Sequence, residues 1–271
     1  MNALLSPAEV VAAYAGTGKK KCALPVLRAF LLAVLAGALI AFAGAATNTA
    51  AHSAGAVGTV RLICGLLFPF GLGIVILTGS ELFTGNCLIA ISVAEKAATL
   101  SGMLRNWCIV YLGNLVGSLA VAAGCAFTGQ LDYSGGALAL FTMKLAAGKC
   151  AISFQSGVVL GLFCNVLVCL GVLCAMTARD TAGKILGAYL PVALFVLCGF
   201  EHSVANMFYI PAGLFAKSVP AYAALAAEAG LDLSALTWGN FFLHNLLPVT
   251  LGNILGGAGV GLLLWKGHQT N

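Results

Sequence analysis

The stretch GFEHSVAN at residues 199–206 interrupts an apolar run that extends from Ile185 to Phe215. Ionisable side chains inside such a run are costly and mark a functional or specially satisfied position. A second stretch, GSELFTGN at residues 79–86, follows the apolar run from Arg61 to Thr78 and has the same pattern, Gly-x-Glu with an Asn five residues after the Glu. The two stretches predict two helices that are broken at corresponding points.

A second pair of segments indicates that the repeat is longer than one motif. LGNLVG at residues 112–117 recurs as LGNILG at residues 251–256, each time in the apolar run that follows a Glu motif. The chain therefore divides into a first repeat at residues 22–128 and a second at 153–265. Each repeat holds three apolar runs, and an odd number of crossings inverts the second copy relative to the first. We expect two inverted three-helix repeats.

Composition indicates that lipid is the main solvent of this chain. Of its 271 residues, 61% are hydrophobic and only 8% are charged, and the mean hydropathy is +1.03. These charges are too few to cover a water-facing globule of that size. Apolar runs of the length that crosses a bilayer lie at residues 22–46, 61–78, 108–128, 153–177, 185–215 and 240–265. We expect an all-α integral membrane protein, one domain over residues 1–271, with six transmembrane helices of which the second and fifth are broken.

The chain ends and the cations give an orientation. Residues 1–21 lack a compact signal-peptide pattern, so we expect a short interfacial helix that stays on the mature protein. With the N-terminus in the cytoplasm, nine Lys and Arg fall on inner segments and four on outer ones, which favours both termini inside. The cluster Lys19–Lys21 suits a membrane surface, and we expect no nucleic-acid partner. Trp107, Trp238 and Trp265 lie at predicted helix ends, where aromatic residues anchor membrane helices.

The ten cysteines lie almost entirely inside apolar runs and form no Cys-x-x-Cys pair, which favours a packing role. His52, His244 and His268 fall in other segments from His202, with no spacing for haem or metal. We therefore expect no metal, no cofactor and no catalytic residue, and a transporter rather than an enzyme. A membrane redox enzyme remains the alternative from that class, and an absorbance spectrum of the purified protein would distinguish it.

The breaks themselves suggest the kind of substrate. Each break leaves backbone N–H and C=O groups unpaired, which a membrane tolerates only where protein or a water-filled cavity satisfies them. Half-helix N-termini present positive dipole ends, which suit a small anion. Glu81 and Glu201 would repel that anion, so we expect them to accept hydrogen bonds from the exposed N–H groups instead. The imidazole of His202 can donate a hydrogen bond or a proton to a weak-acid anion, and Thr84 offers a hydroxyl in the opposing break.

Four segments together resemble the formate/nitrite transporter family: ELFTGN at residues 81–86, FCNVLVCL at 163–170, GFEHSVANMF at 199–208 and NLLPVTLGN at 245–253. The resemblance covers essentially the whole chain, in order. It implies an aquaporin-like protomer, a homopentamer with one pore per subunit, and a prokaryotic inner (plasma) membrane.

The resemblance also implies roles for particular residues. His202 corresponds to the central pore histidine, Thr84 to the loop threonine that faces it, and Asn165 to a polar pore-lining residue. Lys149 corresponds to a lysine near the outer vestibule, where it would draw the anion inward and favour proton release from His202. The apolar constrictions on both sides of His202 are expected at Phe68, Leu72, Leu82, Phe83 and Phe195. Structural roles at the breaks are expected for Glu81, Asn86, Glu201, Asn206, Asn114 and Asn253.

The substrate is the least determined part of the prediction. Gly85 and Asn86 follow the loop threonine, whereas the formate branch of the family often has Ser-Thr there and the nitrite branch Gly-His. We expect a channel or transporter for a small monovalent weak-acid anion, with formate ranked first and nitrite or hydrosulfide as alternatives. A water or glycerol channel of the same fold is the alternative from another class, and glycerol-driven swelling of proteoliposomes without formate flux would favour it.

Overall fold

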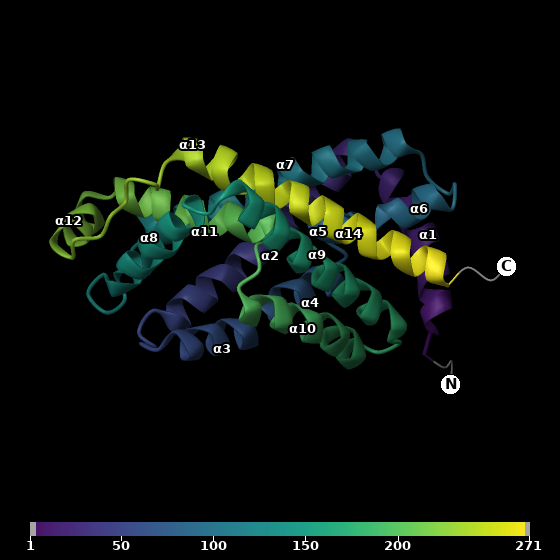
Figure 1. Ribbon diagram of the computed structural model, residues 1–271, viewed down its shortest axis with the longest axis horizontal. Helices are drawn as coiled ribbons and strands as arrows, with labels where there is room; N and C mark the ends of the chain where they lie inside the picture. Colours follow the sequence, from purple (N-terminus) through teal and green to yellow (C-terminus); the bar gives the residue numbers. More distant parts are fainter. Residues whose placement is uncertain (1–3, 269–271) are drawn as a thin grey trace.

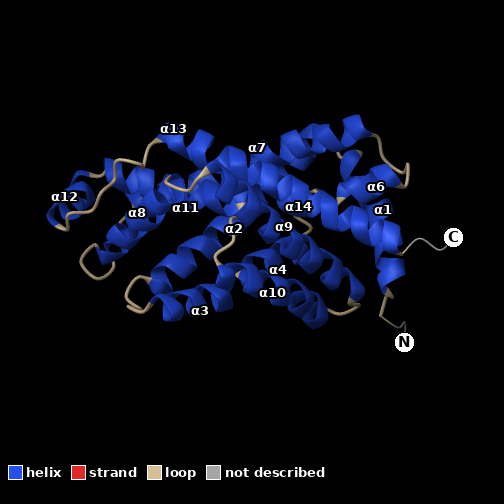
Figure 2. Ribbon diagram, viewed as in Figure 1, coloured by secondary structure: helices blue, strands red, loops and turns tan. Residues whose placement is uncertain are grey.

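The computed structural model describes residues 4–268, which form helices and loops and, within that range, no strand (Figure 2). The helices run in this order: α1 (Pro7–Cys22), α2 (Val26–Ala51), α3 (Val57–Leu67), α4 (Pro69–Thr78), α5 (Phe83–Asn86), α6 (Ile89–Ala94), α7 (Leu100–Phe127), the 3₁₀ turn η1 (Gln130–Asp132), α8 (Ala137–Cys150), α9 (Phe154–Thr177), α10 (Thr181–Cys198), α11 (Ser203–Ser218), α12 (Pro220–Glu228), α13 (Trp238–Asn240), the π-helical turn η2 (Phe241–Leu246) and α14 (Leu247–Gly267). The C-terminal end of α14 lies near α1 at one end of the molecule, and α12 lies at the other end (Figure 1).

Six helices are long and apolar enough to cross a membrane among the described residues, as the hydropathy predicted. They span Val26–Ala51, Val57–Thr78, Leu100–Phe127, Phe154–Thr177, Thr181–Cys198 and Trp238–Gly267. Their outer surfaces carry exposed large hydrophobic side chains such as Leu31, Leu190 and Leu263, an arrangement that a lipid environment accommodates. The protein is a multi-pass membrane protein.

The third spanning helix begins earlier than hydropathy predicted. The Thr99 side chain caps α7 by accepting a hydrogen bond from the N–H of Gly102, so the helix starts at Leu100 and not near residue 108. Trp107 therefore lies inside the protein, and its indole N–H donates to the Asn86 carbonyl over 2.9 Å. The expectation that Trp107 is an interfacial anchor was wrong.

The second and fifth helices are broken at matching points, as predicted. α4 ends at Gly79 with φ +64°, and α10 ends at Gly199 with φ +72°. Both values lie in the left-handed region, which glycine enters without steric cost and in which helices commonly end. After three further residues the chain becomes helical again, at α5 in the first repeat and α11 in the second.

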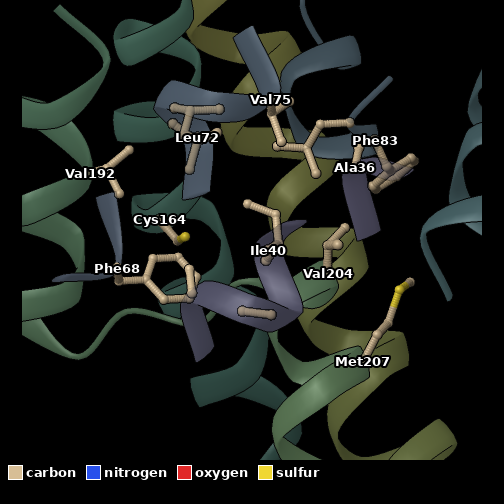
Figure 3. Packing of buried hydrophobic residues seen from close by; sticks show 14 of the residues in the cluster. Ala36, Ile40, Phe68, Leu72, Val75, Phe83, Cys164, Val192, Val204 and Met207 are labelled. Atoms are coloured by element: carbon tan, nitrogen blue, oxygen red, sulfur yellow. The ribbon is translucent and has the colours of Figure 1, made fainter. Parts of the chain in front are cut away.

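The two repeats are each held together by one close helix crossing. A Cβ atom on Gly117 of α7 would stand 2.0 Å from the Val34 carbonyl oxygen of α2. In the second repeat, a Cβ atom on Gly256 of α14 would stand 2.1 Å from the Leu162 carbonyl oxygen of α9. Only glycine permits backbones to approach this closely, as at many membrane helix pairs. Aliphatic and aromatic side chains from both repeats fill the interior between these pairs (Figure 3).

The N-terminal helix α1 is more deeply placed than an interfacial helix. Its start is capped reciprocally by Ser6 and Glu9, and hydrogen bonds from the Ser6 backbone N–H and hydroxyl lower the pKa of the Glu9 carboxyl group. One face packs against α6 and α9, with Tyr14 only 1% exposed. The Tyr14 hydroxyl donates to the Gly85 carbonyl over 3.1 Å. The helix is therefore attached to the first break.

Candidate functional site

Two cavities approach the breaks from opposite sides. The large cavity, about 680 Å³, is lined by residues of α2, α3, α8, α10 and α11, among them Lys149, and by Glu201 and His202 of the second break. The small cavity, about 190 Å³, lies between α1, α4, α9 and the first break, and Lys21 lines it. No residue is shared by the two linings. The protein between them is the barrier that any solute would have to cross.

Apolar side chains form both walls of this barrier. Phe68 and Phe195 line the large cavity, and Leu72 and Leu82 line the small one. Each is 3% exposed. The Phe195 ring stacks on the imidazole of His202, with centroids 5.9 Å apart and planes 13° apart, while Phe68 meets Phe195 edge-on. The predicted constrictions on both sides of His202 thus occupy positions suited to that role.

A single polar contact joins the two breaks inside the barrier. The Thr84 Oγ1 atom lies 2.9 Å from the His202 Nε2 atom, and both residues are buried. The other ring nitrogen, Nδ1, accepts the backbone N–H of Ala205 over 2.9 Å and so caps α11. A nitrogen that accepts a hydrogen bond carries no proton, so the imidazole is neutral, with its hydrogen on Nε2. His202 therefore donates to Thr84.

The neutral imidazole leaves one donor unused at this point. Thr84 accepts from His202, and its own hydroxyl hydrogen has no other partner among the described residues. An imidazolium would need both ring nitrogens as donors, which would break the bond from the Ala205 N–H. The pair is therefore arranged to donate a hydrogen bond and not to hold an extra proton.

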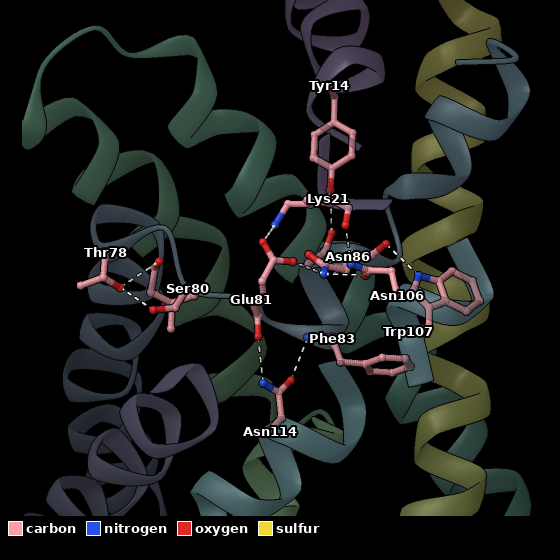
Figure 4. Close-up of polar contacts among 12 residues, drawn as sticks. Tyr14, Lys21, Thr78, Ser80, Glu81, Phe83, Asn86, Asn106, Trp107 and Asn114 are labelled. Atoms are coloured by element: carbon pink, nitrogen blue, oxygen red, sulfur yellow. Dashed lines mark hydrogen bonds and ion pairs between the residues drawn. The ribbon is translucent and has the colours of Figure 1, made fainter. Parts of the chain in front are cut away.

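A network of polar side chains fixes the first break (Figure 4). The Glu81 carboxylate accepts from the Lys21 ammonium over 2.8 Å and from the Asn86 amide over 2.7 Å. The Asn86 amide also donates to the Asn106 side-chain oxygen, and the Asn106 amide donates to the Lys21 carbonyl. Asn114 satisfies the backbone of the break, accepting from the Phe83 N–H and donating to the carbonyl groups of Glu81 and Ala33.

The second break repeats this network bond for bond. The Glu201 carboxylate accepts from Lys149 over 2.8 Å and from Asn206 over 2.6 Å. The Asn206 amide also donates to the Asn245 side chain, which in turn donates to the Lys149 carbonyl. Asn253 accepts from the Ser203 N–H and donates to the carbonyls of Glu201 and Gly161. The polar scaffold is thus duplicated together with the helices.

These contacts correct the expected partners of the glutamates. We predicted that Glu81 and Glu201 accept hydrogen bonds from backbone N–H groups at the breaks. Their carboxylates instead accept from lysine and asparagine side chains, and the backbone groups are satisfied by Asn114 and Asn253. The reason is geometric, since an amide both donates and accepts and can pair with the N–H and C=O groups of one break together.

The two breaks differ where the two polar groups meet. Aligned on their glycine, glutamate and asparagine, His202 stands where the first repeat has Leu82, and Thr84 stands where the second has Val204. The scaffold is therefore symmetric, while the pair that joins the breaks is not. This separation distinguishes residues that build the breaks from residues that can act on a solute.

Comparison with known proteins gives the class. The family model described as formate/nitrite transporter matches residues 8–266. The chain belongs to the formate/nitrite transporter family. A probable formate transporter of Methanothermobacter thermautotrophicus is 39% identical, with 96% of both chains covered, and the formate channel FocA of Escherichia coli K12 is 36% identical, with 97% of this chain and 94% of that protein covered.

Solved structures of the formate/nitrite transporter family share the fold as well as the sequence. A pentameric formate channel with formate bound is 37% identical and has a TM-score of 0.79, with 89% of this chain and 96% of that chain covered. An FNT family ion channel is 28% identical and has a TM-score of 0.81, with 95% and 98% covered. The expected fold, six helices in an aquaporin-like family protomer, is confirmed.

Asn165 and Phe83, like Thr84 in the barrier, line neither cavity of this formate/nitrite transporter. The Asn165 amide donates to the Thr84 carbonyl over 3.1 Å and to the Asn253 carbonyl over 2.6 Å, so it positions the loop that carries Thr84. Phe83 was expected at a constriction, but its ring packs edge-on against Trp107 and Tyr111. Phe83 follows Leu82 in the chain, but only Leu82 lines the small cavity, and the Phe83 N–H donates to Asn114.

Three members of the networks were not predicted. Lys21 was assigned to a surface cluster, and Asn106 and Asn245 were not singled out. A signal was present, since Asn106 precedes Asn114 by eight residues and Asn245 precedes Asn253 by the same interval. Extending the repeat backward from the LGN motifs would have identified both asparagines.

Proposed function

We propose that each protomer passes a small monovalent weak-acid anion, formate first, between the two cavities. The observation that carries this proposal is the hydrogen bond between Thr84 and His202, the polar contact inside an otherwise apolar barrier. Formate is ranked first because relatives that match nearly the whole chain are named formate channels or transporters. Transport is proposed to be passive and without an enzymatic step.

The charges of the large cavity favour an anion. His202 caps the N-terminus of α11, a helix of 16 residues whose positive dipole end faces the barrier. Lys149 lies beside it, but its ammonium is paired with Glu201 and lies 5.6 Å from the centroid of the Tyr209 ring. In this proposal Lys149 contributes mainly by fixing the break. The unused donor of the Thr84 hydroxyl then stabilises the anion as it leaves water.

His202 acts as a hydrogen-bond donor in this mechanism. The anion arrives in the large cavity, passes Phe68 and Phe195, and accepts a hydrogen bond from Thr84 while His202 Nε2–H supports the threonine oxygen. A buried hydrogen bond to a charged acceptor is stronger than one between neutral groups. The anion then passes Leu82 and Leu72 to the small cavity. The hydrogen bond from Thr84 lowers the free-energy cost of the crossing, and the mechanism needs no charged histidine.

We also propose that the protein is a homopentamer in a prokaryotic plasma membrane, with both termini in the cytoplasm. The solved formate channel described as pentameric supports the assembly. The excess of cations on the predicted inner segments supports the orientation, which makes the large cavity the outer one. α1 and the end of α14 lie at the same end of the molecule, as this orientation requires (Figure 1).

Formate flux into proteoliposomes tests the role of His202. His202→Phe keeps a ring but has no donor, so the Thr84 hydroxyl that binds the anion loses the group that orients and polarises it, and we expect flux to fall at least tenfold. His202→Gln places an amide N–H at a similar reach and cannot carry a transferable proton. If donation is the role, the glutamine variant should retain flux within about threefold of the wild type.

The control and the contrary outcomes are specific. Ser118→Ala removes another buried hydroxyl, which donates to the Gly37 carbonyl of α2, and should leave flux unchanged. A glutamine variant as inactive as the phenylalanine variant, with both eluting as folded protein, would contradict donation and favour proton transfer. Swelling in glycerol with no formate flux in the wild type would replace the anion proposal with a neutral-solute channel.

A further inference from the structure

The two cavities differ in charge although the scaffold around them is duplicated. Three cations, Arg61, Lys144 and Lys149, and one carboxylate, Glu201, line the large cavity, which gives a net charge of +2. In the small cavity the lining cation is Lys21, and Glu81 pairs with it. The excess positive charge therefore lies on one side of the barrier. It comes from Arg61 and Lys144, and the lining of the small cavity has no cation that corresponds to either of them.

The Arg61 guanidinium has a defined position in the large cavity. Its Nη1, Cζ and Nη2 atoms lie 2.8, 2.9 and 2.9 Å from the point where a Cβ atom on Gly199 would stand. A Cβ atom that lay in the guanidinium plane could not be equally far from all three atoms at 2.8–2.9 Å. The equal distances therefore place the Cβ position above the plane, so the guanidinium lies flat over the glycine. The second break thus provides a platform for the guanidinium.

The donors of Arg61 are unoccupied. Among residues 4–268 the Arg61 side chain makes no hydrogen bond and no ion pair, whereas Lys149 of the same cavity is paired with Glu201. Its position beyond the last turn of α10 is favourable for a cation, since the C-terminus of a helix carries partial negative charge. A flat, unpaired guanidinium offers two parallel N–H groups, which match an acceptor with two oxygen atoms in one plane.

We infer that Arg61, held on Gly199, forms a recognition site for planar anions that carry two oxygen atoms on one centre, the class to which both formate and nitrite belong. The site rests on the proposed anion transport and adds to it a selection step before the barrier. Spherical chloride, and hydrosulfide with its single acceptor atom, cannot present two oxygen atoms to the two N–H groups. Lys144 contributes charge to the same cavity but no planar pair of donors, so it attracts anions without distinguishing them.

Thermal unfolding of the purified protein tests this site separately from transport. At equal ionic strength, sodium formate or sodium nitrite at about ten times its dissociation constant should raise the melting temperature above that in sodium chloride by about 2–4 °C. Arg61→Gln and Arg61→Lys should both lose this difference, because neither side chain has the planar pair of donors. Lys144→Gln, which removes the same charge from the same cavity, should keep it.

The outcomes separate this inference from the proposed function. His202→Phe should lose flux yet keep the stabilisation by formate, because the site lies in the cavity and not in the barrier. In flux measurements, Arg61→Gln should raise the KM for formate roughly tenfold, and Lys144→Gln by less than threefold. Equal effects of Arg61→Gln and Lys144→Gln, or a wild type that formate and nitrite stabilise no more than chloride does, would overturn the site.

Discussion

Asn114→Leu and Asn253→Leu are each expected to abolish the accumulation of folded protein. Either substitution removes three hydrogen bonds and leaves one N–H and one C=O group of the break buried without partners, while the third group, the carbonyl of Ala33 or Gly161, keeps its bond within its own helix. Each stranded group costs about 1–3 kcal/mol, so the sum is a large part of the stability of a typical domain. Size-exclusion elution and thermal unfolding in detergent measure the loss.

The duplicated scaffold supplies controls for this prediction. Asn114→Asp keeps an acceptor for the Phe83 N–H but loses both donations, so its stability should fall between the leucine variant and the wild type. Asn48 is also buried, but its amide makes one side-chain hydrogen bond, at 3.3 Å to Thr142, and Asn48→Leu should cost far less. Equal melting temperatures for Asn114→Leu and Asn48→Leu would show that the break does not depend on the asparagine.

Lys149→Met is expected to destabilise the protein strongly, while the double variant Lys149→Met with Glu201→Gln is expected to recover. The Glu201 side chain is 8% exposed, and removing its partner leaves a charge that is buried and unpaired. Breaking a buried ion pair on one side costs about 3–5 kcal/mol. The glutamine of the double variant is neutral and still accepts from Asn206. Melting temperatures of the three proteins measure the recovery.

Formate flux in the same proteins separates two roles of Lys149. If the lysine acts by fixing the break through Glu201, flux in the double variant should return to within about threefold of the wild type together with stability. The matched pair Lys21→Met with Glu81→Gln makes the same change at the other break and should behave alike. A double variant that folds normally but passes no formate would show that Lys149 handles the anion itself.

The sequence predicted the six spanning helices and also the two points at which the second and fifth helices are broken. Two copies of Gly-x-Glu with an asparagine five residues later were sufficient to locate the breaks. A glycine in the left-handed conformation ends each helix, and polar side chains satisfy the backbone N–H and C=O groups that the break leaves unpaired. The opposition of Thr84 and His202 followed from the inverted repeat and the family resemblance. In the structure their side chains lie 2.9 Å apart, as that expectation requires.

The rotation of each helix about its axis was the part that sequence could not supply. In a membrane both the lipid-facing and the core-facing sides are apolar, so hydrophobic periodicity carries little information about which side is inside. We therefore placed Phe83 at a constriction that Leu72 and Leu82 line, whereas the Phe83 ring packs against Trp107 and Tyr111. The pattern also gave no sign that the Asn165 amide is bonded to the Thr84 carbonyl. Trp107 was placed at a helix end because hydropathy carries no information about the N-cap at Thr99, which starts α7 at Leu100.

The duplicated polar scaffold has a consequence for direction. A polar scaffold that is the same when viewed from either face of the membrane cannot by itself make the two faces of the protein different. In this protein that difference arises where the copies differ, and along the proposed pathway these places include Leu82 against His202, Thr84 against Val204, and Arg61 over one glycine but not the other. The difference between the two faces thus depends on single side chains carried by a symmetric framework. Exchanging those residues between the two repeats would give the same pathway with the opposite orientation in the membrane.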